Sequence, residues 1–443
     1  MKSKKMFLVL LIIVGLVIGW MITLKNVSGI DDINKQKKLV EQADQFDEKQ
    51  LYIRGIPLLK EALNIQTKNN PDIERKLLDA YREHGDVDDY YDLLLKMDKD
   101  KEHLYGLPSD YLSLAQYYVE NGDVKNALLV ARSGLQKHDD SVLEDFFEQY
   151  RYETTLSNVD FETITVSNGE IFPAYDGQSW NYITRDGQIS LQVDAQEAFP
   201  FNGQGYTVVK IDNQYYSINE DGDLYGLDET GVDEILGLTD NYIIAKKDGL
   251  YGYYNYDFEL LSEKLQFEDI AINNCGVTLA KKDGKWAIFS DSGKQITDFI
   301  YEDICKNTLG CAFCENRAMV KKDGAWILID STGEQLSKDT YIDAKAPESD
   351  GYIAVADADG KWGFIDQKGK LVIDYQYDDA VSFSSEVAAV KIVNAWGYIS
   401  AKNVRVVDTD YVQASPFYNG IACVTQLDGQ LAFIKQQYFD LDE

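Results

Sequence analysis

The sequence predicts an α+β protein of several domains: a cytoplasmic tip and transmembrane anchor over residues 1–30, helical repeats over 31–150, and an all-β repeat domain over 151–443. Three observations predict this architecture. A long apolar run lies near the start, a helical pattern with few β-branched runs follows it, and one motif then recurs eight times. A fixed period is typical of stacked or circular repeats, in which neighbouring units complete each other's core.

Two series of landmarks define the β repeats. Each unit opens with a short motif whose clearest copy is Tyr377-Asp378-Asp379-Ala380, and successive openings lie 34 to 40 residues apart. A series of mostly aromatic positions has the same spacing, and the one long step falls at the same place in both series, which predicts a short insertion between Cys305 and Met319. The aromatic positions are Trp180, Tyr215, Tyr251, Trp286, Trp326, Trp362 and Trp396. We interpret them as structural, because a residue that every unit requires is more simply a packing element than a ligand contact.

Within a unit the pattern is that of strands. Trp362 and Phe364 alternate with Gly363 and Ile365, and Asp-Gly pairs mark hairpin turns because both residues tolerate positive φ. These pairs are Asp248-Gly249, Asp283-Gly284, Asp323-Gly324, Asp359-Gly360 and Asp428-Gly429. Three or four short strands in each unit predict a β-propeller-like arrangement, in which residues 431–434 pair with the start of the domain. An open solenoid of stacked β-hairpins is the alternative.

Two units carry a family signature, Lys361-Trp362-Gly363-Phe364-Ile365-Asp366 and Ala395-Trp396-Gly397-Tyr398-Ile399. These segments resemble the repeats of the bacterial WG-repeat proteins, and the resemblance covers about residues 161 to 443. Other units depart from the signature: Trp286 and Trp326 are not followed by Gly, and Tyr251 replaces the Trp. The resemblance implies repeat modules, often joined to other domains, and implies no particular activity.

The N-terminus has the features of an uncleaved membrane anchor. Lys2, Lys4 and Lys5 precede an uncharged apolar run from Met6 through Leu24, which is long enough to cross a hydrocarbon core as a helix. The run is longer than a usual signal-peptide core. Because lysines precede the span, we expect a single-pass cell-membrane protein with a cytoplasmic N-terminus and extracytoplasmic domains.

Residues 31–150 are predicted to form helix pairs. Large residues share one face of a helix at Tyr111, Leu114 and Tyr118, and small residues follow at Ala127, Ala131 and Gly134, where a second helix can approach closely. This pattern resembles a tetratricopeptide helix pair. An earlier copy centres on Gly85-Asp86, offset by 37 residues instead of the usual 34. These helices are expected either to bind a peptide or to act as a spacer.

The net charge of −32 argues against nucleic acid and against anionic membrane surfaces as partners. Paired lysines recur one unit apart, at Lys246-Lys247, Lys281-Lys282 and Lys321-Lys322. They are interpreted as solvated flanks of turns, and a local basic stripe is the alternative.

No catalytic, cofactor-binding or metal-binding constellation is expected. The histidines, His84, His103 and His138, all lie in the helical part, so the β domain lacks one for a Ser-His-Asp relay or a zinc site. Cys311 and Cys314 supply at most half a zinc site, and a local disulfide, with Cys305 as another partner, is compatible with the spacing.

The resulting expectation is a membrane-anchored, extracytoplasmic binding or scaffold protein. Its repeats would present surfaces to a protein or glycan at the cell envelope, and residues 6–24 would hold it in the membrane. The alternative is a cell-envelope enzyme that acts on polysaccharide through paired carboxylates, as glycoside hydrolases do.

Overall fold

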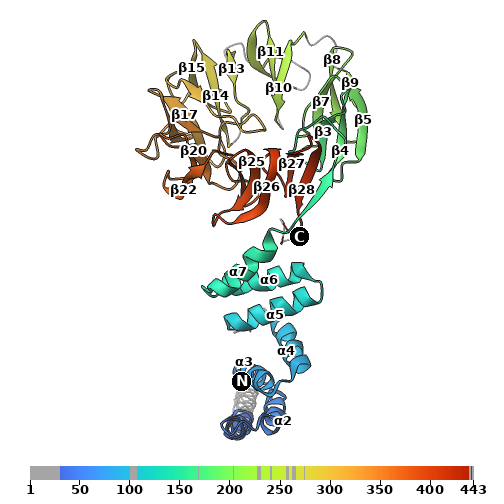
Figure 1. Ribbon diagram of the computed structural model, residues 1–443, viewed down its shortest axis with the longest axis vertical. Coiled ribbons are helices and arrows are strands. Elements are labelled where there is room, and N and C mark those ends of the chain that lie inside the picture. Colours follow the sequence, from blue (N-terminus) through green and yellow to red (C-terminus); the bar gives the residue numbers. More distant parts are fainter. Residues whose placement is uncertain are drawn as a thin grey trace, which may run out of the picture. The chain divides into compact units, whose positions relative to one another are not determined.

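The protein consists of a helical unit and a β-repeat unit, Met1–Arg151 and Tyr152–Glu443. A computed structural model describes residues 30–99, 107–167, 169–202, 204–226, 231–239, 242–255, 259–261, 266–273, 275–438 and 441. Figure 1 shows that all labelled helices precede the first strand along the chain. Each unit has its own hydrophobic cores, so the two are described separately.

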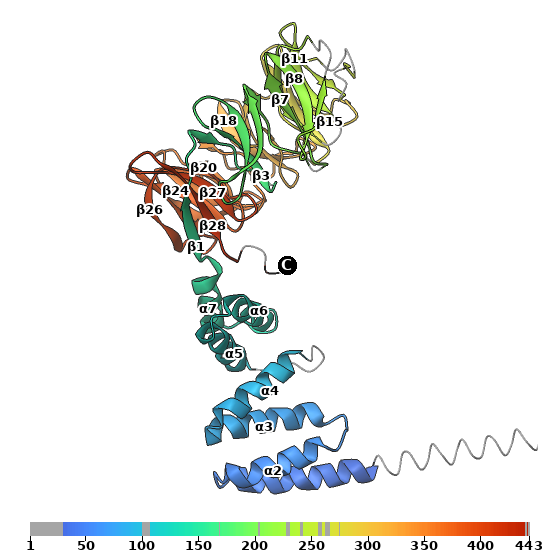
Figure 2. The ribbon, with the colours of Figure 1, turned by 90° about the vertical axis from the view of Figure 1, so that its right-hand side faces the viewer.

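The helical unit begins with a helix that includes residues 30–47, and further helices follow in short succession. Their bounds are α2 (Tyr52–Leu63), α3 (Asn70–His84), α4 (Val87–Lys99), α5 (Pro108–Glu120), α6 (Val124–Leu135) and α7 (Ser141–Arg151). Proline stands in the first turn of α3 and of α5, where the missing N–H has no helical partner to lose. Figure 2 shows α2 and α3 lying side by side, and one core that contains Leu59, Leu78 and Leu114 runs through the unit.

A buried ionic contact links three of these helices. The side chain of Asp110 on α5 is 2% exposed and is paired with the guanidinium of Arg75 on α3. Tyr90 on α4 donates its hydroxyl to the same carboxylate at 3.3 Å, and the backbone N–H of Leu107 does so at 2.8 Å. Asp110 therefore joins the start of its own helix to two others.

The expected membrane anchor requires correction. No helix in the described residues is long and apolar enough to cross a membrane. The apolar run over residues 6–24 lies outside the described residues. The assignment of a single-pass membrane protein with extracytoplasmic domains is therefore not supported, and we withdraw it.

In the part of the β-repeat unit that the structure describes, the strands form seven separate sheets, and every pairing within them is between antiparallel strands. The first two sheets contain β2 (Thr163–Ile164), β3 (Ile171–Tyr175), β4 (Trp180–Thr184) and β5 (Ile189–Ala195), then β6 (Glu197–Ala198), β7 (Tyr206–Ile211), β8 (Gln214–Asn219) and β9 (Leu224–Gly226). The next three contain β10 (Glu234–Leu238), β11 (Ile243–Lys247) and β12 (Leu250–Tyr254), then β13 (Asp269–Ile270), β14 (Val277–Lys282) and β15 (Lys285–Ser290), then β16 (Asp303–Ile304), β17 (Arg317–Lys322) and β18 (Ala325–Asp330). The sixth contains β19 (Asp343–Ala344), β20 (Ile353–Ala356), β21 (Trp362–Ile365) and β22 (Leu371–Tyr377).

The seventh sheet joins the two ends of the unit. It contains β23 (Asp379–Ala380), β24 (Val387–Ile392), β25 (Ala395–Ser400), β26 (Arg405–Ala414), β27 (Ile421–Gln426), β28 (Leu431–Gln436) and β1 (Thr154–Asn158). β1 pairs with β28 over its whole length, from Thr154 opposite Gln436 to Asn158 opposite Ala432. The expected pairing of the C-terminal strand with the start of the domain is therefore confirmed.

The expected β-propeller-like arrangement also requires correction. The described strands form sheets of three to seven strands, and they make neither a closed barrel nor a propeller of eight equivalent blades. The physical reason lies in β26, which is one continuous strand of 10 residues that pairs with both β25 and β27. It merges the last two repeats into one sheet. The open solenoid fails as well, because the first and last strands of the unit pair with each other.

Three of the predicted hairpin turns have the backbone that Asp-Gly favours. Asp283 and Gly284 have φ of 50° and 74°, and the pairs at 248–249 and 323–324 are similar. The other two pairs differ, because only the glycine of each, Gly360 or Gly429, has positive φ. Between β20 and β21 the loop is longer, and the N–H of Gly360 donates to the carbonyl of Asp357 at 3.0 Å.

Candidate functional site

The two landmark series meet at the junctions between repeats. In six junctions the aromatic position of one unit lies directly opposite the opening residue of the next unit. These pairs are Trp180 with Ala195, Tyr251 with Phe267, Trp286 with Tyr301, Trp326 with Tyr341, Trp362 with Tyr377, and Trp396 with Tyr411. The repeat positions singled out in the sequence therefore lie where one unit passes into the next.

Most of these aromatic side chains are buried, and a lysine lies over many of the rings. Tyr215, Tyr251, Trp286, Trp326 and Trp362 are buried, whereas Trp180 and Trp396 are half-buried. The lysine Nζ to ring-centroid distances are 5.0 Å for Lys210 over Tyr215, 5.1 Å for Lys246 over Tyr251, 5.8 Å for Lys281 over Trp286, 5.9 Å for Lys321 over Trp326 and 6.0 Å for Lys391 over Trp396. The first member of each paired-lysine motif thus makes a cation–π contact within its own hairpin.

The acidic second position of the opening motif caps the hairpin turn of its own unit. The carboxylate of Glu268 accepts from the N–H groups of Asp283 at 2.9 Å and Gly284 at 3.0 Å. Glu302 accepts from Gly324 at 3.0 Å. The repeated acidic residue and the repeated turn are therefore two parts of one structural device.

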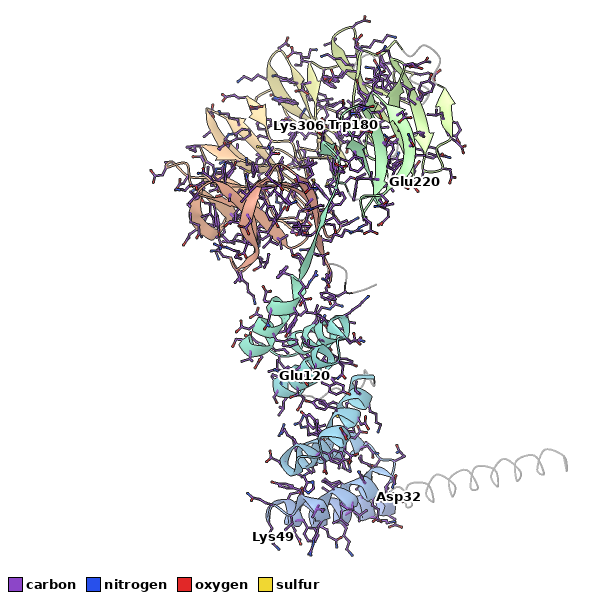
Figure 3. All side chains as sticks on the ribbon, turned by 45° about the vertical axis from the view of Figure 1, so that its right-hand side comes forward. Asp32, Lys49, Glu120, Trp180, Glu220 and Lys306 are labelled. Atoms are coloured by element: carbon purple, nitrogen blue, oxygen red, sulfur yellow. The ribbon has the colours of Figure 1, made fainter. Side chains whose placement is uncertain are left out.

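Segments from five successive repeats line a cavity of about 860 Å³ in the β-repeat unit. They lie in, or directly after, the opening strands β2, β6, β10, β13 and β16, and residues 236–238 belong to β10 itself. The repeat therefore brings equivalent segments to the same place. The large apolar side chains of the lining include Trp180, Phe199, Phe201, Leu236, Leu238 and Leu309. Figure 3 labels Trp180, which begins β4. This is the candidate site.

The lining is apolar and almost without charge. Among its described residues Glu197 is the one carboxylate, and no lysine, arginine or histidine is present. Glu197 is already engaged, because it accepts from the Lys210 ammonium and from the Tyr215 hydroxyl, each at 2.9 Å. The lysine is therefore held beside the carboxylate, and this hydrogen bond raises the pKa of Lys210.

Two of the polar side chains of the lining, those of Asn202 and Thr239, are also engaged in internal contacts. Asn202 accepts from the N–H groups of Gln204 and Tyr206, both at 3.0 Å. The Thr239 hydroxyl donates to the carbonyl of Tyr242 at 3.1 Å. These bonds fix the loops, and they leave the aromatic and aliphatic side chains as the main surface that the cavity offers to a ligand.

The insertion that the sequence located in the fifth repeat forms one wall of the cavity. Residues 308–311 line it, and the N–H of Ile272 donates to the carbonyl of Gly310 at 2.9 Å. A Cβ on Gly237 would lie 2.2 Å from Cδ1 of Ile272, so this wall is tightly packed. The sequence reasoning did not identify these residues as a site, although the single 40-residue step in the period was the available signal.

A buried carboxyl group lies in another of the equivalent loops. Glu348 follows β19 and is 5% exposed, and its Oε2 accepts from the Tyr418 hydroxyl at 3.0 Å. Burial raises the pKa of Glu348 to about 7, and burial also raises the pKa of Tyr418. Tyr418 is hydrogen-bonded to the side chain of Thr308, which lines the cavity. Nothing in the sequence had singled out this pair.

The cysteines and histidines do not form a reactive centre in the described residues. Cys311 and Cys314 are not joined by a disulfide, and burial raises the pKa of each thiol to about 12. No group of potential ligands that could hold a metal ion is found in the described part of the chain. His84 contacts Asp86 at 2.9 Å, and His103 lies outside the described residues.

Comparison with known proteins identifies the repeat type. A family model described as WG containing repeat matches residues 251–286, 362–394 and 396–429, so the resemblance to WG repeats is confirmed for this part of the chain. No curated protein matches the sequence.

Two solved structures show a weak likeness. Hsv2p from Kluyveromyces lactis is 11% identical, with a TM-score of 0.35, and the match covers 54% of this chain and 92% of that one. The CNH domain of AfRom2 is 10% identical, with a TM-score of 0.31, and the match covers 56% of this chain and 95% of that one.

Proposed function

We propose that this chain is a binding or scaffold protein whose β-repeat unit holds a protein or glycan partner in the cavity formed at the opening strands β2, β6, β10, β13 and β16 and the residues directly after them. The observation that supports this most directly is the convergence of equivalent segments from five repeats on one mostly apolar cavity of about 860 Å³. Concave, mostly apolar pockets of about 300 to 1,000 Å³ are the usual form of binding sites in proteins.

The chemistry of the lining supports binding in preference to catalysis. General acid–base or paired-carboxylate chemistry requires titratable groups that can reach a substrate. The one carboxylate among the described lining residues is Glu197, and Lys210 and Tyr215 already engage it. The alternative of a polysaccharide-acting enzyme therefore has less support from the cavity. The strongly acidic chain also disfavours nucleic acid as the partner.

The helical unit is proposed to be tetratricopeptide-like, with α5 and α6 as one helix pair. Ala127 and Ala131 on α6 are completely buried. A Cβ on Gly134 would lie 2.8 Å from the ring of Tyr111 on α5, so these small residues permit close helix packing. Such a unit would provide a second surface for a protein partner.

Site-specific photocrosslinking tests the proposed function. A photoreactive amino acid replaces Leu309, which lines the cavity, or Leu427, which is 74% exposed in the turn between β27 and β28. The purified full chain is then irradiated in extracts and with immobilised glycans. We expect discrete adducts from position 309 and not from position 427. Adducts that are the same from both positions, or none from position 309, would contradict the proposal.

A further inference from the structure

The charge of the cavity disfavours one broad class of ligand. Phosphate, sulfate and carboxylate groups are recognised in proteins by Arg, Lys or clusters of N–H donors. The described lining residues include no basic side chain, and the whole chain carries a net charge of −32. An anionic ligand would meet no compensating cation in the cavity and would be repelled on approach.

The hydrogen bonding of the lining argues against a sugar. A buried hydroxyl that loses its water needs a protein donor or acceptor, and a group left without one weakens binding. The side chains of Asn202 and Thr239 are engaged with the backbone of their own loops, and that of Asn273 with Tyr242. A neutral oligosaccharide would therefore compete with bonds that hold the loops in place.

What the cavity does offer is apolar surface on several sides. Phe199 and Phe201 come from the second repeat, Leu236 and Leu238 from the third, and Leu309 from the fifth. All five side chains are partly exposed, so a ligand can reach them. Removing aliphatic and aromatic groups from water against such surface favours a complex.

We propose that the cavity binds an extended peptide segment of a partner protein, with apolar side chains in the cavity and with basic or neutral residues on either side. The inference rests on the proposed binding function and specifies its ligand class. An extended segment projects side chains in alternate directions, so it can place apolar groups against walls from different repeats. Basic flanking residues would be favoured by the acidic chain, which would also increase the rate of association.

A selection experiment on the full chain tests the ligand class. A phage library of random dodecapeptides is selected on the immobilised protein, and recovered peptides are synthesised and titrated by fluorescence anisotropy. We expect recovered sequences to be enriched in apolar and basic residues and depleted of Asp and Glu. Recovery of no binding peptide, or of acidic peptides, would overturn the inference.

Matched variants then test whether the peptide binds in the cavity. Leu309→Arg introduces a cation and bulk into the cavity, and Leu427→Arg makes the same change at the exposed turn between β27 and β28. We expect Leu309→Arg to weaken peptide binding by about tenfold or more, as for a central contact, and Leu427→Arg to change it less than about twofold. Leu236→Arg is the second cavity variant, and thermal unfolding identifies which variants are folded.

The outcomes separate this inference from the proposed function. If a neutral glucan or chitin oligosaccharide binds the wild-type chain and Leu309→Arg abolishes that binding, the peptide inference is wrong but the cavity remains a binding site. If selected peptides bind both folded cavity variants as tightly as the wild type, the cavity is not the binding site, and both proposals fail.

Discussion

Trp326 and Tyr341 exchange two backbone hydrogen bonds at the junction of two repeats: Trp326 N–H donates to the carbonyl of Tyr341 at 2.9 Å, and Tyr341 N–H donates to that of Trp326 at 3.0 Å. Both side chains are at most 8% exposed and belong to one hydrophobic cluster. The aromatic position of one repeat and the opening residue of the next therefore form a single packed contact.

Truncation of a junction aromatic should destabilise the β-repeat unit. Trp326→Ala or Trp362→Ala should lower the free energy of unfolding by about 3–5 kcal/mol, because each removes a large buried side chain. Urea denaturation followed by far-ultraviolet circular dichroism measures this. Trp396, which is half-buried, is the matched position where the loss should be smaller. A Trp362→Ala protein of wild-type stability would show that the indole is not a core element.

Removal of a turn cap should have a smaller effect. Glu268→Ala removes two hydrogen bonds to the turn at Asp283 and Gly284. Because the carboxylate is exposed, we expect the free energy of unfolding to fall by only about 1 kcal/mol. Glu220→Ala, at an exposed glutamate labelled in Figure 3, is the control and should leave the unfolding midpoint unchanged. If the two substitutions changed stability equally, Glu268 would not stabilise the turn.

The cavity wall should respond to overpacking. Gly237→Ala should destabilise the protein by about 1–3 kcal/mol, because the new Cβ would lie 2.2 Å from Cδ1 of Ile272. Ile272→Val removes that methyl group and should recover part of the loss in the double variant. The four proteins are compared by chemical denaturation. Simple additivity of the two single effects would mean that the two residues do not press on each other.

Glu348 should make stability depend on pH in a defined direction. Its pKa lies near 7 in the folded chain against an ordinary value of 4.5, so the folded state holds an extra proton between these pH values. The contribution of this group to stability is therefore present below about pH 4.5 and is lost as pH rises through about 7. The groups that face it are Tyr418, Asp350, Cys311 and Cys314.

Glu348→Gln isolates that effect, since the amide keeps an acceptor for Tyr418 and does not titrate. We expect the stability of the wild type relative to this variant to fall steadily from pH 4.5 to pH 7 in denaturation series. A constant difference across that range would show that Glu348 is ionised normally in the folded state.

In the helical unit, Asp110→Ala should lower the free energy of unfolding by about 3–5 kcal/mol. The reason is that the substitution leaves the partly buried guanidinium of Arg75 without one of its carboxylate partners. Asp79, which contacts Arg75 at 2.5 Å, is 42% exposed and gives the comparison. Asp79→Ala should have the weaker effect in thermal unfolding of the full chain. If Asp79→Ala destabilised the protein more than Asp110→Ala, the exposed ion pair with Asp79 would contribute more to stability than the buried one with Asp110.

Most features that repeat could be predicted from the sequence, whereas most features that occur once could not. The spacing of the aromatic positions and the turn at Asp283-Gly284 follow from local pattern. The pairing of residues 431–434 with the start of the domain occurs once, and it was predicted because it hides two strand edges. The long strand β26, which merges two repeats, has no signature in the period because its sequence still carries the regular landmark at Tyr411.

The candidate site could not be predicted from the sequence, because it also depends on contacts between different repeats. Its lining comes from loops in five repeats, and contact between loops depends on how the sheets pack and not on the residues of any one unit. Glu348 and Tyr418 are 70 residues apart, so their contact has no local signal. The insertion before Met319 was visible in the spacing, but its role as a cavity wall required the fold.

The most direct test of a peptide-binding cavity is hydrogen–deuterium exchange of the full chain with and without a selected apolar, basic peptide. If the cavity binds the peptide, exchange should slow on binding in residues 199–202, 236–239 and 308–311, with little change in the turn that contains Leu427. Protection confined to the helices, or spread over the outer turns and absent from those three segments, would show that the peptide does not bind in the cavity.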